Sequence, residues 1–153
     1  MYKEVFLTHS AEETEAVGAA LAQLMQADTA LAPFVALFGD LGVGKTAFVR
    51  GFASVFCDKV AVRSPTFSLV NEYRGRTTRL FHFDMYRITD EDDLYSIGFD
   101  DYLMRDGIIL TEWSENIPFA LPDAYIEVII TKNDSEDPDS REIRITEKRE
   151  SLC

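Results

Sequence analysis

The stretch PFVALFGDLGVGKTAFVRGF, residues 33–52, decides the fold. Its residues 34–38 are too apolar for an edge strand, which predicts a buried, parallel strand. After the glycine-rich segment, Phe48, Phe52 and Phe56 recur every four residues and predict a helix whose apolar stripe packs on the sheet. A strand, a glycine loop and a helix in this order are typical of a phosphate-binding loop.

The glycine loop carries a specific motif, because Gly39, Gly44, Lys45 and Thr46 match the P-loop pattern G-x4-G-K-[ST]. Its glycines let consecutive backbone N–H groups converge on phosphate oxygens, and the helix N-terminus adds partial positive charge. We expect Lys45 to bridge the terminal phosphates and the Thr46 hydroxyl to ligate Mg²⁺. The expected nucleotide-binding residues of the loop are Gly39, Asp40, Leu41, Gly42, Val43, Gly44, Lys45, Thr46 and Ala47.

Two strand-like runs end in acidic residues: Asp84 follows LFHF, and Glu112 follows GIILT. Hydrolysis of a bound nucleotide needs a carboxylate near the metal, and open α/β sheets place their sites at the carboxyl ends of strands. Spacing alone leaves open which residue is the Walker B acid. Asp84, Glu112 and Lys45 are therefore the candidate catalytic residues.

Periodicity predicts the remaining elements. Ser10 and Glu13 have the spacing of a capping box, which starts a helix that runs to about Met25. The further expected elements are a hairpin of residues 63–73 and 79–88, a short helix within 89–99, a strand at 107–113 and a hairpin of 125–132 and 141–148. Together they predict one α/β domain over residues 1–153, P-loop NTPase-like and three-layered, with helices flanking a mixed parallel/antiparallel sheet.

Charge and composition narrow the class of protein. The chain has 15 basic and 27 acidic residues, a net charge of −12, which works against sequence-independent binding to nucleic acid. Residues 59–87 are the exception, with six basic residues against two acidic ones. They either solubilise a hairpin edge or face phosphates or an acidic partner. No membrane span or leader is recognisable, and the two cysteines lack metal or disulfide spacing, so we expect a soluble cytoplasmic protein.

Four motifs, in this order and spacing, give the chain a family resemblance. They are GDLGVGKTAFVRGF (39–52), SPTFSLVNEY (64–73), FHFDMYR (81–87) and TEW (111–113). With them the chain resembles the TsaE family, formerly YjeE, of bacterial P-loop ATPases in tRNA threonylcarbamoyladenosine biosynthesis. The resemblance runs over nearly the whole chain.

The resemblance implies roles for particular residues with ATP and Mg²⁺ as cofactors. Thr46 and Glu112 would hold Mg²⁺, Asp84 would lie close to the phosphates and the attacking water, and Thr66 would sit in a switch-like loop. The adenine would lie between the N-terminal segment at Ser10 and Ala11 and the strand end at Lys132. Each of the two residues also has a purely structural interpretation. Ser10 can be only the cap of the helix, and Lys132 can be only a solvent-exposed residue at the end of a strand.

The resemblance further implies two partner proteins, a TsaD-like catalytic subunit and its TsaB-like paralogue, with tRNA contacted only indirectly. ATP hydrolysis, low without these partners, would support repeated N6-threonylcarbamoylation of the adenosine next to the anticodon. Two alternatives stay open at this point. One is a nucleotide-dependent regulatory binding module, and the other is a small-molecule or protein kinase, although no long insertion is present to form a lid.

The remaining motif residues have less definite roles. In a strand, His82, Asp84 and Tyr86 would alternate onto one face. His82 is then either a structural hydrogen-bonded group or a base. Arg87 pairs locally or serves a partner interface. Trp113 is expected to be half-buried beside Glu112, where it either packs the site or offers an aromatic anchor to another subunit.

Overall fold

The computed structural model describes residues 2–59, 61–65 and 69–150. Its strands form one seven-stranded sheet in the order β1-β7-β6-β2-β5-β4-β3. The strands are β1 (Lys3–Thr8), β2 (Phe34–Phe38), β3 (Val70–Arg74), β4 (Arg79–Asp84), β5 (Ile108–Glu112), β6 (Ala124–Asp134) and β7 (Asp137–Arg149). The helices are α1 (Ala11–Ala27), α2 (Lys45–Phe56), α3 (Glu91–Ser96) and α4 (Phe99–Leu103), with short 3-10 turns η1 (Ser114–Asn116) and η2 (Pro118–Ala120).

The centre of the sheet is parallel and its two margins are antiparallel. Strand β2 pairs in parallel with both β5 and β6, and β5 pairs in parallel with β4. The margins are the pairs β1–β7, β6–β7 and β3–β4. This confirms the predicted mixed sheet and places the carboxyl ends of β2, β4 and β5 at one edge.

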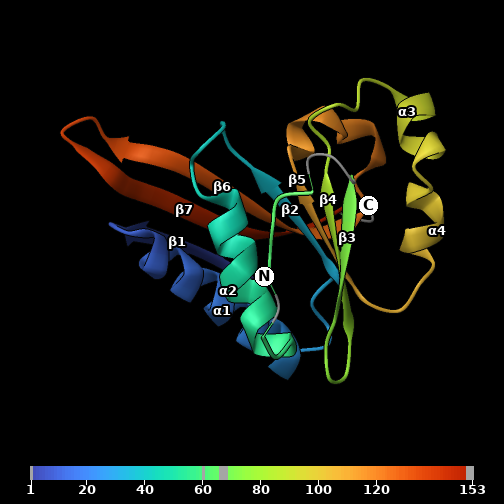
Figure 1. Cartoon of the computed structure of the whole chain (residues 1–153), viewed down its shortest axis with the longest axis horizontal. Coiled ribbons are helices and arrows are strands. Elements are labelled where there is room, and N and C mark those ends of the chain that lie inside the picture. The colour runs from blue at the N-terminus through green and yellow to red at the C-terminus, as the bar shows by residue number, and fades with distance from the viewer. Residues whose placement is uncertain (1, 60, 66–68, 151–153) are drawn as a thin grey trace.

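Helices cover both faces of the sheet, as the three-layer prediction requires. In β2, Val35 and Leu37 face the core that contains α1 and α2, whereas Phe34 and Ala36 face the core that contains α3 and α4. Figure 1 shows α1 and α2 side by side, with α3 and α4 apart from them beyond the β3–β4 hairpin. The side chains of β2 alternate between the two cores because successive residues of a strand point to opposite faces of the sheet, and β2 is buried on both faces.

The predicted stripe on α2 is confirmed as core. Phe48 and Phe52 are fully buried and Phe56 is 6% exposed. Arg50 points away from the core and pairs with Glu15 of α1 at 2.9 Å. At the crossing of the two helices, a Cβ on Gly51 would lie 1.8 Å from the carbonyl oxygen of Glu15, so only glycine permits this approach.

Three local features differ from the sequence prediction. Strand β1 was not expected, because most of its side chains are exposed and it gives no clear alternation. Helix α4 was not expected either, since it is short and starts at Gly98 in the left-handed conformation. The C-terminal strands extend to Asp134 and from Asp137, so the ladder takes up most of the polar segment 133–140 that we predicted to be loop.

The start of α1 has the predicted cap with one change. The Ser10 hydroxyl accepts a hydrogen bond from the Glu13 backbone N–H at 3.1 Å. The Glu13 carboxylate accepts from the backbone N–H of His9 at 2.8 Å, one residue before the position of a standard capping box. Among the described residues, no helix has the length and apolarity to cross a bilayer.

Candidate functional site

The P-loop connects β2 to α2 as predicted, and its glycines are required by backbone conformation. Gly39, Gly42 and Gly44 have φ angles of 145°, 77° and 112°, a region that other residues rarely adopt. Gly44 is the N-cap of α2, so the first helical N–H groups face the end of the loop. The strand, loop and helix therefore form the expected phosphate cradle.

Lys45 extends back along the loop from the first turn of α2. Its Nζ donates a hydrogen bond to the Gly39 carbonyl oxygen at 2.5 Å and lies 3.7 Å from the centroid of the Trp113 ring. The side chain is 5% exposed. Burial lowers the pKa of this ammonium, and the opposing effect comes from the carboxylates of Glu115, Glu112, Asp84 and Asp40.

The two candidate acids lie side by side at the carboxyl edge of the sheet. Asp84 and Glu112 are direct partners in the β4–β5 register, and they are 5% and 4% exposed. Both carboxylate oxygens of Glu112 lie 3.3 Å from the Thr46 hydroxyl. Asp84 accepts from the Tyr86 backbone N–H at 2.9 Å and from the Ser64 hydroxyl at 3.5 Å. Of the two acids, Glu112 is thus the one whose carboxylate contacts Thr46 of the P-loop.

This arrangement fits a magnesium ion by its donor set. Mg²⁺ binds oxygen ligands and is usually held by one or two protein groups together with substrate phosphates. The Thr46 hydroxyl and the Glu112 carboxylate supply such a pair beside the loop. Among the described residues, no cluster of three or more His, Cys, Asp or Glu side chains forms a metal cage on its own.

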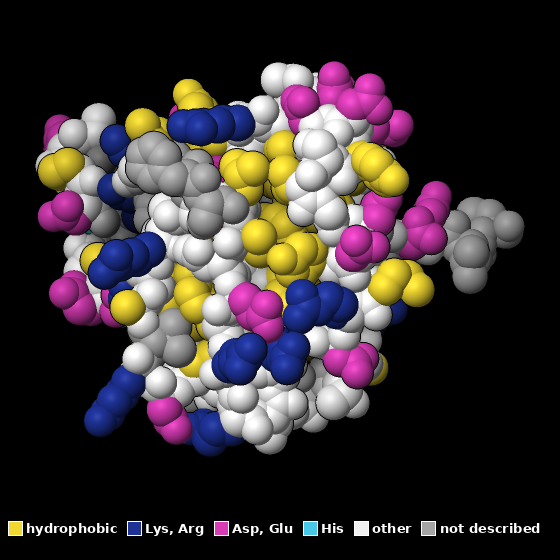
Figure 2. Space-filling model, turned by 45° about the vertical axis from the view of Figure 1, so that its right-hand side comes forward, with side chains coloured by type: hydrophobic (Ala, Val, Ile, Leu, Met, Phe, Trp, Pro, Cys, Tyr) yellow, Lys and Arg dark blue, Asp and Glu magenta, His cyan; other side chains and the backbone are white. Residues whose placement is uncertain are grey.

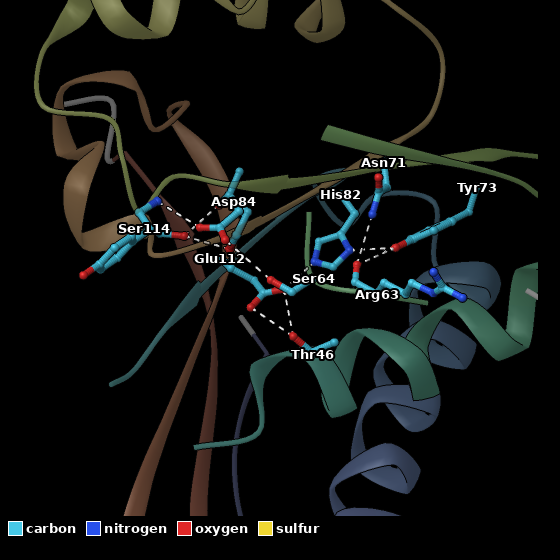
Figure 3. Close-up of polar contacts among 11 residues, drawn as sticks. Thr46, Arg63, Ser64, Asn71, Tyr73, His82, Asp84, Glu112 and Ser114 are labelled. Carbon is cyan, nitrogen blue, oxygen red and sulfur yellow. Dashed lines mark hydrogen bonds and ion pairs between the residues drawn. The ribbon is translucent and has the colours of Figure 1, made fainter. Parts of the chain in front are cut away.

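A buried histidine connects Glu112 to the β3–β4 hairpin (Figure 3). His82 is fully buried, and its Nε2 lies 2.5 Å from Glu112 Oε2. Its Nδ1 lies 2.9 Å from the Tyr73 hydroxyl. Of the two interpretations of His82 in the sequence, the structural hydrogen-bonded group is the one that these contacts support.

The catalytic candidates surround one cavity of about 510 Å³, a volume typical of small-ligand pockets. P-loop residues, both acids and the aromatic pair Tyr86 and Trp113 contribute to its wall. The described residues that line it are Leu41, Gly42, Gly44, Lys45, Thr46, Ala47, Ser64, Asp84, Tyr86, Glu112 and Trp113. The structure therefore brings Lys45, Thr46, Asp84 and Glu112 together.

The residues expected around the adenine lie elsewhere. Lys132 lines a second cavity of about 430 Å³ on the side of the loop formed by Asp40, Leu41 and Val43. Ser10 and Ala11 are at the start of α1, and neither lines either of these two cavities. Thr66 lies outside the described residues. The adenine position stays a prediction.

The sequence only partly predicted the positions of three further motif residues, Tyr86, Arg87 and Trp113. Strand β4 ends at Asp84, so Tyr86 and Arg87 lie past the strand end, and both are exposed. Trp113 is half-buried beside Glu112, as expected, and its ring centroid lies 5.1 Å from that of Tyr86. Trp113 has a φ of 57°, a left-handed conformation that is unfavourable for a bulky residue.

Two residues that hold the loop were missed in the sequence. Glu115 Oε2 accepts from the backbone N–H of Gly39 at 2.9 Å. Arg141, on β7, donates from Nε to the Val43 carbonyl oxygen at 2.9 Å. Glu115 lies in the η1 turn, three residues after the end of β5 at Glu112, so the strand pattern did not indicate it. Arg141 lies 98 residues from Val43 and carries no local signal.

The basic residues of segment 59–87 are all on the surface. Arg76 forms an ion pair with Asp58 at 2.5 Å, and Arg79 forms one with Glu72 at 3.5 Å. Figure 2 shows basic side chains gathered low on one face and acidic side chains at its upper right. The exposed basic residues are Lys59, Arg63, Arg74, Arg76, Arg79 and Arg87. Their surface position fits both a solubilised hairpin edge and a surface that faces phosphates or an acidic partner.

Comparison with known proteins gives consistent matches over most of the chain. The family model described as "Threonylcarbamoyl adenosine biosynthesis protein TsaE" matches residues 8–143. The tRNA threonylcarbamoyladenosine biosynthesis protein TsaE of Bacillus subtilis (strain 168) is 36% identical over 149 residues, which are 95% of this chain and 89% of the relative. The protein of the same name from Haemophilus influenzae is 40% identical over 122 residues, 80% of this chain and 75% of the relative.

A solved structure agrees with the fold. The crystal structure of YdiB from Bacillus subtilis is similar to this chain with a TM-score of 0.74 and 29% sequence identity. The similarity covers 96% of this chain and 86% of the other. The α/β fold with a P-loop is thus shared over nearly the whole chain.

Proposed function

The chain belongs to the TsaE family of threonylcarbamoyl adenosine biosynthesis proteins, and from this membership we propose that it is a Mg²⁺-dependent ATPase that supports N6-threonylcarbamoylation of tRNA. One observation carries the chemical part of the proposal. The Thr46 hydroxyl of the P-loop lies 3.3 Å from both carboxylate oxygens of Glu112, in the cavity that also contains Lys45 and Asp84. A P-loop with an acid at this position has the parts that hydrolysis requires.

Each of these residues has a distinct proposed role. The loop N–H groups and Lys45 bind the terminal phosphates, for which Lys45 exchanges its contact with the Gly39 carbonyl. Thr46 and Glu112 hold Mg²⁺, which neutralises the charge that develops on the transferred phosphoryl group. Asp84, buried next to Glu112, orients the attacking water. Closely packed Tyr86 and Trp113 limit the access of other water.

The proposed partners are a TsaD-like catalytic subunit and a TsaB-like paralogue, with tRNA bound by them. The net charge of −12 supports this division, because a strongly acidic chain is a poor ligand for a polyanion. The exposed basic residues of segment 59–87 then face a protein partner.

The proposal is tested by ATP hydrolysis with Mg²⁺, measured for the wild type and Glu112→Ala, alone and with both partners and tRNA. Glu127→Ala is the matched control, since Glu127 is a half-buried strand residue away from the cavity. We expect turnover to rise with the partners and to fall by at least about a hundredfold in Glu112→Ala only. ATP binding without hydrolysis in every condition would instead establish a nucleotide-dependent binding module.

A further inference from the structure

His82 is a buried titratable residue that the proposed reaction does not use. The chain has two histidines, and His9 is exposed at the start of α1. His82, by contrast, is fully buried in β4, and it is not among the described residues that line the site cavity. A group in this position has no direct access to a bound nucleotide, so any effect of His82 on the site passes through its neighbours.

The neighbour on one side is the metal-site acid. His82 Nε2 lies 2.5 Å from Glu112 Oε2, and both side chains are almost completely buried. A carboxylate only accepts hydrogen bonds, so Nε2 carries the proton in this contact. The contact restrains the Glu112 carboxylate through Oε2, and both oxygens of the carboxylate lie 3.3 Å from the Thr46 hydroxyl. Hydrogen bonds that hold a metal ligand in this way commonly change metal affinity or activity by about 10- to 100-fold.

The neighbour of His82 on the other side is Tyr73, which does not line the site cavity. Nδ1 of His82 lies 2.9 Å from the Tyr73 hydroxyl, which in turn lies 3.2 Å from the carbonyl oxygen of Arg63. Asn71 donates to the same carbonyl at 3.1 Å. Figure 3 shows these groups as one chain of polar contacts from Glu112 to the backbone of Arg63. Arg63 belongs to the described segment 61–65, which also places Ser64 at Asp84.

Each ring nitrogen of His82 therefore has one partner, and rotation of the imidazole would lose both contacts. The sheet register fixes the path, because β4 lies between β5, which carries Glu112, and β3, which carries Tyr73. A simple packing role in the core needs neither of these directed contacts. The described buried side chains include no polar atom without a partner, so the network is complete without an added group.

We propose that His82 is a positioning residue: it holds Glu112 in the orientation that faces Thr46, and through Tyr73 it makes that orientation depend on the backbone of segment 61–65. This inference rests on the proposed function in one respect, the assignment of Glu112 as a ligand of Mg²⁺. It gives segment 61–65 two contacts with the site, one to each acid: the chain Arg63–Tyr73–His82 to Glu112, and Ser64 to Asp84. A partner that moves this segment would change the metal site without touching it.

Two substitutions of His82 separate its two contacts. The amide nitrogen of glutamine can take the place of Nε2, and that of asparagine can take the place of Nδ1. His82→Gln therefore keeps a donor for Glu112, whereas His82→Asn keeps a partner for Tyr73 and loses the contact with Glu112. The two variants bury a similar polar amide at the same position, so each controls for the effect of the other on folding.

The primary readout is the Mg²⁺ concentration at half-saturation of the ATP-bound protein, followed by the fluorescence of Trp113, the single tryptophan of the chain. ATP affinity without Mg²⁺, kcat and the thermal midpoint are measured in parallel. We expect His82→Asn to need at least about tenfold more Mg²⁺ and to lose about tenfold in kcat. His82→Gln stays within about threefold of the wild type in both, and ATP affinity without Mg²⁺ is unchanged in the two variants.

Equal Mg²⁺ dependence in the wild type and in folded His82→Asn would overturn the inference. So would equal losses in both variants that follow their thermal midpoints, because a purely structural role predicts that result. If the wild type hydrolyses no ATP, the proposed function fails, but the Mg²⁺ titration needs no turnover and still decides the role of His82. Tyr73→Phe tests the second contact: we expect normal Mg²⁺ dependence without partners and a smaller stimulation by them, and full stimulation would remove segment 61–65 from the inference.

Discussion

The ammonium nitrogen of Lys45 lies 3.7 Å from the centroid of the indole ring of Trp113. A cation in this position is attracted by the electron-rich face of the ring, most strongly where both groups are shielded from water. The same nitrogen donates to the Gly39 carbonyl. Both contacts compete with the contact that Lys45 would make with a bound phosphate, so nucleotide binding must change the surroundings of Trp113.

We expect ATP to change the fluorescence emission of Trp113, because Lys45 leaves the ring to contact the phosphates. Lys45→Ala should show no such change at ATP concentrations that saturate the wild type, since it lacks both the cation and the phosphate ligand. Lys148→Ala is the control, because Lys148 is an exposed lysine on β7 that pairs with Glu127 at 3.9 Å. An ATP response of wild-type size in Lys45→Ala would contradict the role given to Lys45.

The positions of Asp84 and Glu112 predict different effects of removing each charge. Glu112 contacts Thr46, and Asp84 instead accepts from the Tyr86 backbone. We expect Glu112→Gln to raise the Mg²⁺ concentration at half-maximal rate by at least about tenfold. Asp84→Asn should lower kcat by roughly a hundredfold with little effect on the Mg²⁺ requirement. Steady-state hydrolysis over a range of Mg²⁺ concentrations measures both, and the reverse pattern would exchange the two roles.

Arg141 predicts that the C-terminal hairpin stabilises the P-loop from a distance. Its guanidinium contacts the carbonyl oxygens of Val43 at 2.9 Å and Gly42 at 3.5 Å. We expect Arg141→Ala to weaken ATP binding about fivefold to tenfold, because the loop loses a charge-assisted hydrogen bond that fixes its conformation. Arg144→Ala is the matched control on the same strand, where Arg144 is exposed and pairs with Glu142. Equal ATP affinities of the two variants, measured by calorimetry, would show that the contact does not support the loop.

The sequence predicted the parts of the site that depend on local patterns. The P-loop spacing, the apolar run of β2 and the stripe at Phe48, Phe52 and Phe56 are all confirmed, because each signal lies within one turn or one strand. The two acids were recognised as strand ends, but their order beside Thr46 depends on how β4 and β5 align. That alignment is a property of the whole sheet, so spacing along the chain did not decide it.

The features that were missed depend on contacts between distant segments. Strand β1 is held by its pairing with β7 at the margin of the sheet, and its exposed side chains give little pattern. Arg141 is the first residue of the predicted strand 141–148, but nothing local to it indicates that its guanidinium contacts Val43. Strands β6 and β7 also continue through segment 133–140, whose composition is that of a loop. Tertiary pairing outweighed local propensity in that segment.

Glu147 predicts a specific pH dependence of stability at the β1–β7 margin. Its carboxylate accepts from the side chain of Arg149 and from the backbone N–H of Tyr2, and these hydrogen bonds lower its pKa. A carboxyl whose pKa is lower in the folded state stabilises the fold above its unfolded pKa, about 4.3, and loses that contribution as the pH falls through the folded pKa. We therefore expect Glu147→Gln to lower the thermal midpoint by roughly 2 to 4 °C at pH 7. The difference from the wild type should shrink below about pH 4.

The matched control for this change is Glu142→Gln: Glu142 is a half-buried acid of β7 that, like the buried Glu147, pairs with a nearby arginine, in this case Arg144. Within the described residues, the Glu142 carboxylate has no hydrogen bond to the N-terminal segment, so its substitution should change the thermal midpoint less at pH 7. Thermal unfolding followed by circular dichroism between pH 3 and pH 8 measures both variants. The outcome that would contradict this prediction is a difference in thermal midpoint between Glu147→Gln and the wild type that stays constant down to pH 3. Uncharged contacts alone would then account for the loss, and the charge of Glu147 would not stabilise the pairing of β1 with β7.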